Sequence, residues 1–305
     1  MEKMKFDQFT EEVVDKIREF LPESFANASV ELQTVVKNND LKLTGLTIRS
    51  ADSNISPTIY LEQFYDEYQS GKDMGRILSN IADVRIRNEV KEVFDVTQIT
   101  DFEHVKGAIV PRLMNQKWNV DLLKMRPHKF VADLAVTYHI LLKQDITGTA
   151  SVPVTNILME SWGVDTDILH ELSIKNLPLL LPSSFQSMSS VLSGMLGDGE
   201  ETEDILAGIP SQDEVMFILS NEKKMHGASA LLDKKIMQTI IKKFGDFYIL
   251  PSSIHECIIV KATTDIDANM LTAMVQDVNA GQVAVDERLS DHVYRYTAED
   301  GLIFA

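Results

Sequence analysis

Cysteine is almost absent from this chain. A single thiol, Cys257, stands among 305 residues, so no disulfide bond can form within the chain. A framework held together by disulfides is therefore excluded, and this cysteine usage is typical of a reducing compartment. A chain of this length can bury a substantial core without disulfides or metals. We expect a cytoplasmic protein.

Long apolar runs are missing as well. No stretch approaches the roughly 18 consecutive apolar residues of a membrane span. The most apolar segment, residues 177–181, contains Pro178 and is followed by Pro182. The first residues, MEKMKFDQFTEEVV, include lysines but no apolar run of signal-peptide length. We therefore expect neither a membrane span nor an export signal.

The common motifs of cofactor, metal and hydrolase sites do not occur. The chain has no GxxxxGK[ST] or GxGxxG loop for phosphates, and no CxxC, HExxH or HxH spacing for metals. It also lacks the GxSxG turn of a hydrolase serine. Its seven histidines are scattered along the sequence. We therefore expect no cofactor and no metal.

A basic surface for nucleic acid is not indicated either. The net charge is −17, with −4 on residues 1–150 and −13 on residues 151–305. Nucleic-acid binders draw most of their affinity from basic contacts to phosphates. The composition therefore argues against nucleic acid as a partner, and a protein partner stays open.

The first hundred residues predict an N-terminal helix–hairpin–helix subdomain. Apolar residues at helical spacing predict an amphipathic helix over 5–20, which Pro22 ends. Two strands, at 30–36 and 41–48, flank the polar turn 37–40. Further helical spacing extends to about residue 94. We place this subdomain at residues 1–100.

Residues 101–305 predict a main α+β domain. Over 131–142 the even positions are apolar while Thr137 and His139 face the other way, so one face is buried and the other is wet or lined by polar groups. Residues 109–114 are a plausible partner strand. Strand-strand-helix order with short connections favours mixed, mainly antiparallel sheets with helices packed on them. The Gly-rich acidic stretch 193–204 predicts a flexible loop.

One segment, LPSSIHEC at 250–257, concentrates reactive groups. Ser252, His255 and Cys257 are candidates for a catalytic site, because a nucleophile needs a base nearby. No third group that would orient a His255–Cys257 pair is evident. The alternative is a turn between two strands, shaped by proline and serines, with Cys257 as a buried apolar residue.

Three fragments carry a family resemblance: SPTIYL at 56–61, LPSSIHE at 250–256 and LSDHVY at 289–294. With them the chain resembles an uncharacterised bacterial domain-of-unknown-function family (DUF5688). The element order resembles, more distantly, the uncharacterised YtpQ-like family (DUF1444). The resemblance implies a bacterial, cytoplasmic protein, and it implies no activity and no catalytic residue.

Three hypotheses for function follow. The first is a non-catalytic binding or protein-interaction protein, since no catalytic constellation is recognisable. The alternative is an enzyme, a hydrolase or transferase, with a site near Ser252–Cys257. A third is an acidic DNA mimic that uses the more acidic half of the chain.

The reactivity of Cys257 separates the first two hypotheses. Ile258 and Ile259 are adjacent apolar residues, as in a strand buried on both faces, so we expect a covered thiol. Iodoacetamide should label Cys257 slowly in the native protein and readily after unfolding. Fast native labelling that His255→Ala abolishes without unfolding would instead favour the enzyme.

Overall fold

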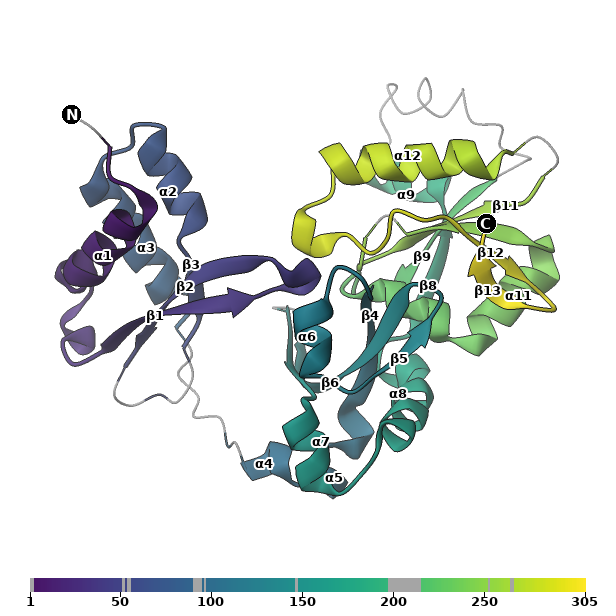
Figure 1. Cartoon of the computed structure of the whole chain (residues 1–305), viewed down its shortest axis with the longest axis horizontal. Helices are drawn as coiled ribbons and strands as arrows, with labels where there is room; N and C mark the ends of the chain where they lie inside the picture. Colours follow the sequence, from purple (N-terminus) through teal and green to yellow (C-terminus); the bar gives the residue numbers. More distant parts are fainter. Residues whose placement is uncertain are drawn as a thin grey trace. The chain divides into compact units, whose positions relative to one another are not determined.

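The computed structural model describes residues 3–50, 53, 56–89, 95, 97–145, 148–196, 215–251, 253–263 and 266–305. The chain divides into two compact units. Unit 1 comprises residues 1–37 and 41–96, and unit 2 comprises Asn38–Asp40 and Thr97–Ala305. Antiparallel sheets and helices make up both, which confirms the α+β class (Figure 1).

Unit 1 packs helices against a three-stranded antiparallel sheet of order β1-β2-β3. Its elements are α1 (Phe6–Lys16), β1 (Ser29–Val36), β2 (Lys42–Arg49), β3 (Thr58–Tyr60), α2 (Glu62–Gln69) and α3 (Met74–Arg87). The predicted hairpin is confirmed, with Ser29 opposite Arg49 and Val36 opposite Lys42. The core of the unit gathers apolar side chains of α1, α3 and the sheet, among them Phe9, Ile48 and Ile77.

Unit 2 contains a four-stranded antiparallel sheet. Its strands are β4 (Ile109–Asn115), β5 (His128–Val131), β6 (Leu134–Asp145) and β7 (Gly148–Pro153). β4 pairs with one edge of β6, and β5 and β7 pair with the other. The predicted strand 131–142 is corrected at its start. Ala132, at φ 52°, and Asp133 form the turn between β5 and β6, so Val131 pairs with Leu134 across a hairpin.

A six-stranded antiparallel sheet of order β13-β12-β10-β11-β9-β8 forms the rest of the framework. Its strands are β8 (Ser183–Ser187), β9 (Met216–Asn221), β10 (Phe247–Leu250), β11 (Cys257–Lys261), β12 (Tyr294–Thr297) and β13 (Gly301–Phe304). The helices and the 3-10 helix of unit 2 used below are α4 (Thr97–Thr100), α5 (Phe102–Val105), α6 (Val120–Lys124), α7 (Asn156–Trp162), α8 (Thr166–Leu180), α9 (Met188–Leu196), η5 (Gly227–Leu232), α11 (Lys234–Phe244) and α12 (Ala268–Gly281).

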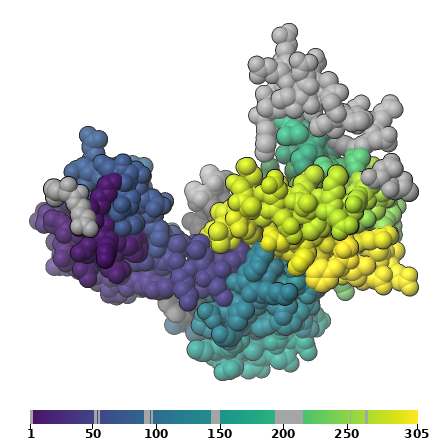
Figure 2. All heavy atoms as spheres, turned by 45° about the horizontal axis from the view of Figure 1, so that its top comes forward, coloured from purple at the N-terminus to yellow at the C-terminus, as the bar shows by residue number. Residues whose placement is uncertain are grey.

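Both faces of the six-stranded sheet are covered. Leu271 and Val275 of α12 pack with Val260 of β11 on one face. Met237 of α11 packs with Cys257 on the opposite face, in the core that also holds the apolar side of β6. Figure 1 shows α12 along the sheet, and Figure 2 shows it forming one surface with the C-terminal strands. The sheet is therefore the middle layer of unit 2.

A buried carboxylate joins the two sheets of unit 2. Asp133 is 7% exposed. Its Oδ1 accepts a hydrogen bond from Tyr294 Oη at 2.6 Å, and its Oδ2 accepts one from Ser290 Oγ at 3.0 Å. His292 Nδ1 lies 2.8 Å from the same Oδ2. Burial acts to raise the pKa of Asp133, but the three hydrogen bonds outweigh it and hold that pKa below its ordinary value.

Two further expectations concern segments only partly covered by the structure. The predicted flexible loop at 193–204 begins inside α9, and its residues from 197 onward lie outside the described residues. Within the described ranges, no helix is both long and apolar enough to span a membrane.

The predicted apolar face of β6 is buried, and the opposite face is covered as well, since Thr137 and His139 are 0% and 6% exposed. The apolar face makes a stability prediction. Val136 is fully buried in the main core, so Val136→Asp places a charge where nothing solvates it and should cost several kcal/mol of unfolding free energy. Phe130→Asp, at a position 53% exposed on β5, is the matched control and should cost little. Urea unfolding of both variants tests this, and equal midpoints would contradict the assignment of faces.

Candidate functional site

The three residues singled out from the sequence have different surroundings. Ser252 lies outside the described residues. Cys257 is fully buried on β11, and burial, followed by the charge of Glu256, raises the pKa of its thiol. His255 lies in the loop before β11 with 27% of its side chain exposed. A buried thiol with a raised pKa is a weak nucleophile, which accords with a structural role for Cys257.

His255 is held by groups other than Cys257. Its Nδ1 accepts a hydrogen bond from the backbone N–H of His226 at 3.1 Å. In the neutral ring the proton is therefore on Nε2, which lies 3.6 Å from Oε1 of Glu287. Ser253 Oγ accepts from the backbone N–H of His255 at 3.0 Å. The imidazole thus belongs to a network that leads toward His226.

The loop between β9 and η5 positions His226. Asn221 closes this loop, since its Nδ2 donates to the carbonyl O of Met225 at 2.8 Å and its Oδ1 accepts from Lys223 N at 3.0 Å. His226 then adopts a left-handed conformation, φ 52°. Gly227 follows because a Cβ there would stand 2.4 Å from the carbonyl O of His255. The two imidazole centroids end 5.4 Å apart.

Arg112 and His139 share the polar face of the four-stranded sheet. Arg112 lies opposite Thr137, and Val110 lies opposite His139. Residues two apart on a strand face the same side, so Arg112 and His139 are diagonal neighbours. Nη2 of Arg112 donates to Ser151 Oγ at 2.6 Å. Because Ser151 is on β7, across β6 from β4, the guanidinium crosses β6 on the side that His139 faces.

Arg126 approaches the same face from the other edge of β6. His128 of β5 lies opposite Thr137, and its Nδ1 is 2.8 Å from the carbonyl O of Arg126. The charge of Arg126 acts on both Arg112 and His139. Arg112, Arg126, His139 and His226 therefore form one group, the Arg112 cluster.

Burial dominates the electrostatics of the Arg112 cluster. It lowers the pKa of His226 to about 3, helped by the charge of Arg112. It also lowers the pKa of His139 well below its usual range. Burial, followed by the charge of Arg126, lowers the pKa of Arg112 from 12.5 to about 10. At about 1.4 kcal/mol for each tenfold change in acidity, Arg112 carries a cost of roughly 3 kcal/mol.

The cluster has polar groups without protein partners. His139 is 6% exposed, and its Nδ1 is buried and makes no hydrogen bond. Across the part of the chain that the structure describes, no ion pair joins Arg112 or Arg126 to a carboxylate. Arg112 and Arg126 are partly buried, and guanidinium groups withdrawn from water are ordinarily paired. The arrangement can therefore accept an anion that supplies the missing negative charge.

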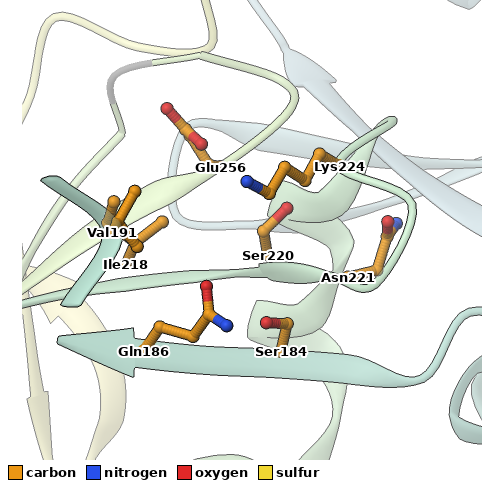
Figure 3. Close-up of a pocket in the computed structure, with 8 residues that line it drawn as sticks. All are labelled: Ser184, Gln186, Val191, Ile218, Ser220, Asn221, Lys224 and Glu256. Carbon is orange, nitrogen blue, oxygen red and sulfur yellow. The ribbon is translucent and has the colours of Figure 1, made fainter. Parts of the chain in front are cut away.

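A small polar pocket lies next to the segment singled out from the sequence. It has a volume of about 120 Å³, and Figure 3 shows side chains of β8 and β9 with Lys224 and Glu256 around it. Ser220, in its wall, donates to the carbonyl O of His255 at 2.7 Å. The volume is below the roughly 300 Å³ at which pockets for drug-sized ligands begin, so this pocket is too small for a ligand of that size.

Sequence reasoning missed most of the Arg112 cluster. Part of the cluster has a signal in the sequence. Residues 109–114 and 131–142 are predicted to pair, and His139 is predicted to lie on a polar face. A strand register would have placed Arg112 beside it. His226 and Arg126 lie in loops, where spacing carries no such signal. As for metals, no group of three or more His, Cys, Asp or Glu in the described ranges is arranged to hold an ion.

Comparisons with known proteins give a family and no activity. A family model described as a family of unknown function (DUF5688) matches residues 6–298, which confirms the first resemblance. No curated protein and no solved structure matches the chain. The resemblance to the YtpQ-like family and the bacterial origin stay predictions.

The neutral imidazole of His226 predicts acid sensitivity. An unfolded histidine has a pKa of about 6.5, so between pH 6.5 and 3 the unfolded state binds the extra proton and the unfolding free energy falls as the pH falls. His226→Asn retains a residue that tolerates the left-handed conformation. This variant should lose about 1.6 kcal/mol less than the wild type between pH 6.5 and 5.

Urea unfolding at the two pH values measures this difference. His104→Asn, at an exposed position of α5, is the control for removing an imidazole. Identical pH dependence of wild type and His226→Asn would show that folding does not lower the pKa of His226.

Proposed function

For this chain, which belongs to a family of unknown function (DUF5688), we propose a role as a non-catalytic binding protein of a bacterial cytoplasm. Its ligand is a small molecule that carries a phosphate group. The observation that supports it is the Arg112 cluster, in which the charges of two guanidinium groups act on the buried imidazole of His139, whose Nδ1 has no partner.

The charge of the whole chain makes this cluster unusual. The chain has a net charge of −17 and 46 acidic residues, so carboxylates for pairing are plentiful. Arg295, for comparison, pairs with Asp246 at 2.7 Å. Arg112 instead has a neutral hydroxyl as its hydrogen-bond partner. An arginine kept apart from carboxylates in an acidic protein remains available to an anion from solution.

A phosphate group suits the cluster better than a single carboxylate. Two guanidinium groups supply two positive charges and a planar set of donors that match phosphate oxygens. The unpartnered Nδ1 of His139 adds a hydrogen-bonding group beside them. A bound dianion would offset the desolvation that lowers the pKa of Arg112 and Arg126.

The chemistry of the nearby groups favours binding over catalysis. The low pKa of His226 leaves it neutral and weakly basic at neutral pH, and the raised pKa of Cys257 keeps its thiol protonated. The enzyme near Ser252–Cys257 and the DNA mimic remain alternative predictions.

Phosphate titrations of Arg112 variants test this function. Calorimetry with inorganic phosphate and with pyrophosphate should show saturable binding to the wild type. Arg112→Gln should weaken it at least tenfold, since a charged hydrogen bond is worth about 1.5–3 kcal/mol. Arg295→Gln removes the same charge at an exposed ion pair and should change affinity less than twofold.

Two results would contradict the proposal. One is the absence of binding by either anion at millimolar concentration. The other is an equal loss of affinity in Arg112→Gln and Arg295→Gln, which would indicate attraction by overall charge alone.

A further inference from the structure

A second cavity in unit 2 lies apart from the Arg112 cluster. It has a volume of about 600 Å³, is open to solvent, and is lined by residues of β5, α8, η5, the start of α11 and the β12–β13 hairpin. This volume is within the range of roughly 300–1,000 Å³ typical of small-molecule sites. The cavity is therefore large enough for a metabolite-sized ligand.

Apolar side chains form much of its wall. Val131, Leu231 and Leu302 line it and belong to or pack against the main core. Tyr296 also lines it, with its ring stacked on Phe247 at a centroid distance of 5.2 Å and an interplanar angle of 13°. These contacts hold the wall in place, so an apolar ligand body would meet a preformed surface.

His170 supplies a directed polar group to the cavity. Its Nδ1 lies 3.2 Å from the hydroxyl of Tyr138, which is fully buried. Burial raises the pKa of Tyr138, so its hydroxyl stays protonated and is able to donate to His170 Nδ1. Burial also lowers the pKa of His170, which favours the neutral ring. In the tautomer that accepts from Tyr138, the proton is on Nε2. The Nε2–H is on the ring edge away from Tyr138 and can donate to a ligand.

The charges around His170 favour an anionic acceptor. Lys129 and Lys234 lower its pKa, and Asp167 acts in the opposite direction. Lys129 pairs with Asp167 at 2.6 Å. Glu171 also lines the cavity, but it is not among the charges that act on His170, so beside this imidazole the ammonium of Lys234 is the charge left over. A donor N–H next to a net positive charge is complementary to a carboxylate.

We propose that this cavity binds a small molecule with an apolar body and a single carboxylate. The carboxylate accepts from His170 Nε2 and faces Lys234, while the body packs against Val131, Leu231 and Leu302. This site is independent of the phosphate site, because the two share no residue.

The test uses 3-phenylpropionate as the probe, with calorimetry on the full chain. Binding should be saturable, and the neutral alcohol 3-phenylpropanol and the cation phenethylamine should bind at least fivefold more weakly. Equal or tighter binding of either would overturn the carboxylate assignment. Binding should persist in Arg112→Gln, and its loss there would place the probe at the phosphate site instead.

Paired variants locate the probe. Lys234→Gln should weaken binding at least fivefold, and Lys235→Gln, the neighbouring lysine of α11, should change it less than twofold. Ile174→Phe narrows the cavity and should weaken binding at least tenfold, whereas Ile168→Phe, at a position 41% exposed on the same helix, should not. Unchanged affinity in Lys234→Gln overturns the proposal even if Ile174→Phe fails to fold.

Discussion

The buried carboxylate of Asp133 fixes the positions of the two sheets of unit 2 relative to each other. It sits in the β5–β6 turn and accepts hydrogen bonds from Ser290 and Tyr294, while His292 lies beside it. A carboxylate this far from water is stable only with its oxygens satisfied. The C-terminal segment must therefore lie against this turn, and the core between the sheets, including Cys257 and Val136, depends on that placement.

The requirement that a buried charge has partners also distinguishes Asp133 from Arg112. Asp133 is buried and both of its carboxylate oxygens accept hydrogen bonds, so its role is structural. Arg112 is partly buried without a carboxylate, and its neighbour His139 has an unpartnered Nδ1. Because an unpaired buried charge lowers stability, an anionic ligand is the physical complement of the cluster.

The two proposed ligand sites arise where covering elements meet the four-stranded sheet. The polar face of β6 meets the loop that carries His226. Arg112 of β4 and Arg126, in the segment before β5, are the charged groups at this place. On the apolar face of β6, Tyr138 points into the core and forms a hydrogen bond with His170 of α8, which lines the second cavity. One strand thus contributes through alternate residues to both sites, as the two-residue period of a strand dictates.

The sequence alone determined the α+β class, the N-terminal hairpin, the buried side of β6 and the family, because each is written in local periodicity, turn residues or motif fragments. It also placed His139 on a polar face. It did not determine the turn at Ala132–Asp133, which depends on a left-handed residue that alternation does not reveal. Nor could it link His255 to His226, or Arg112 to Arg126. These groups are brought together by strand register and loop closure, and the low pKa of His226 and the cost of Arg112 are consequences of burial that only the tertiary structure creates.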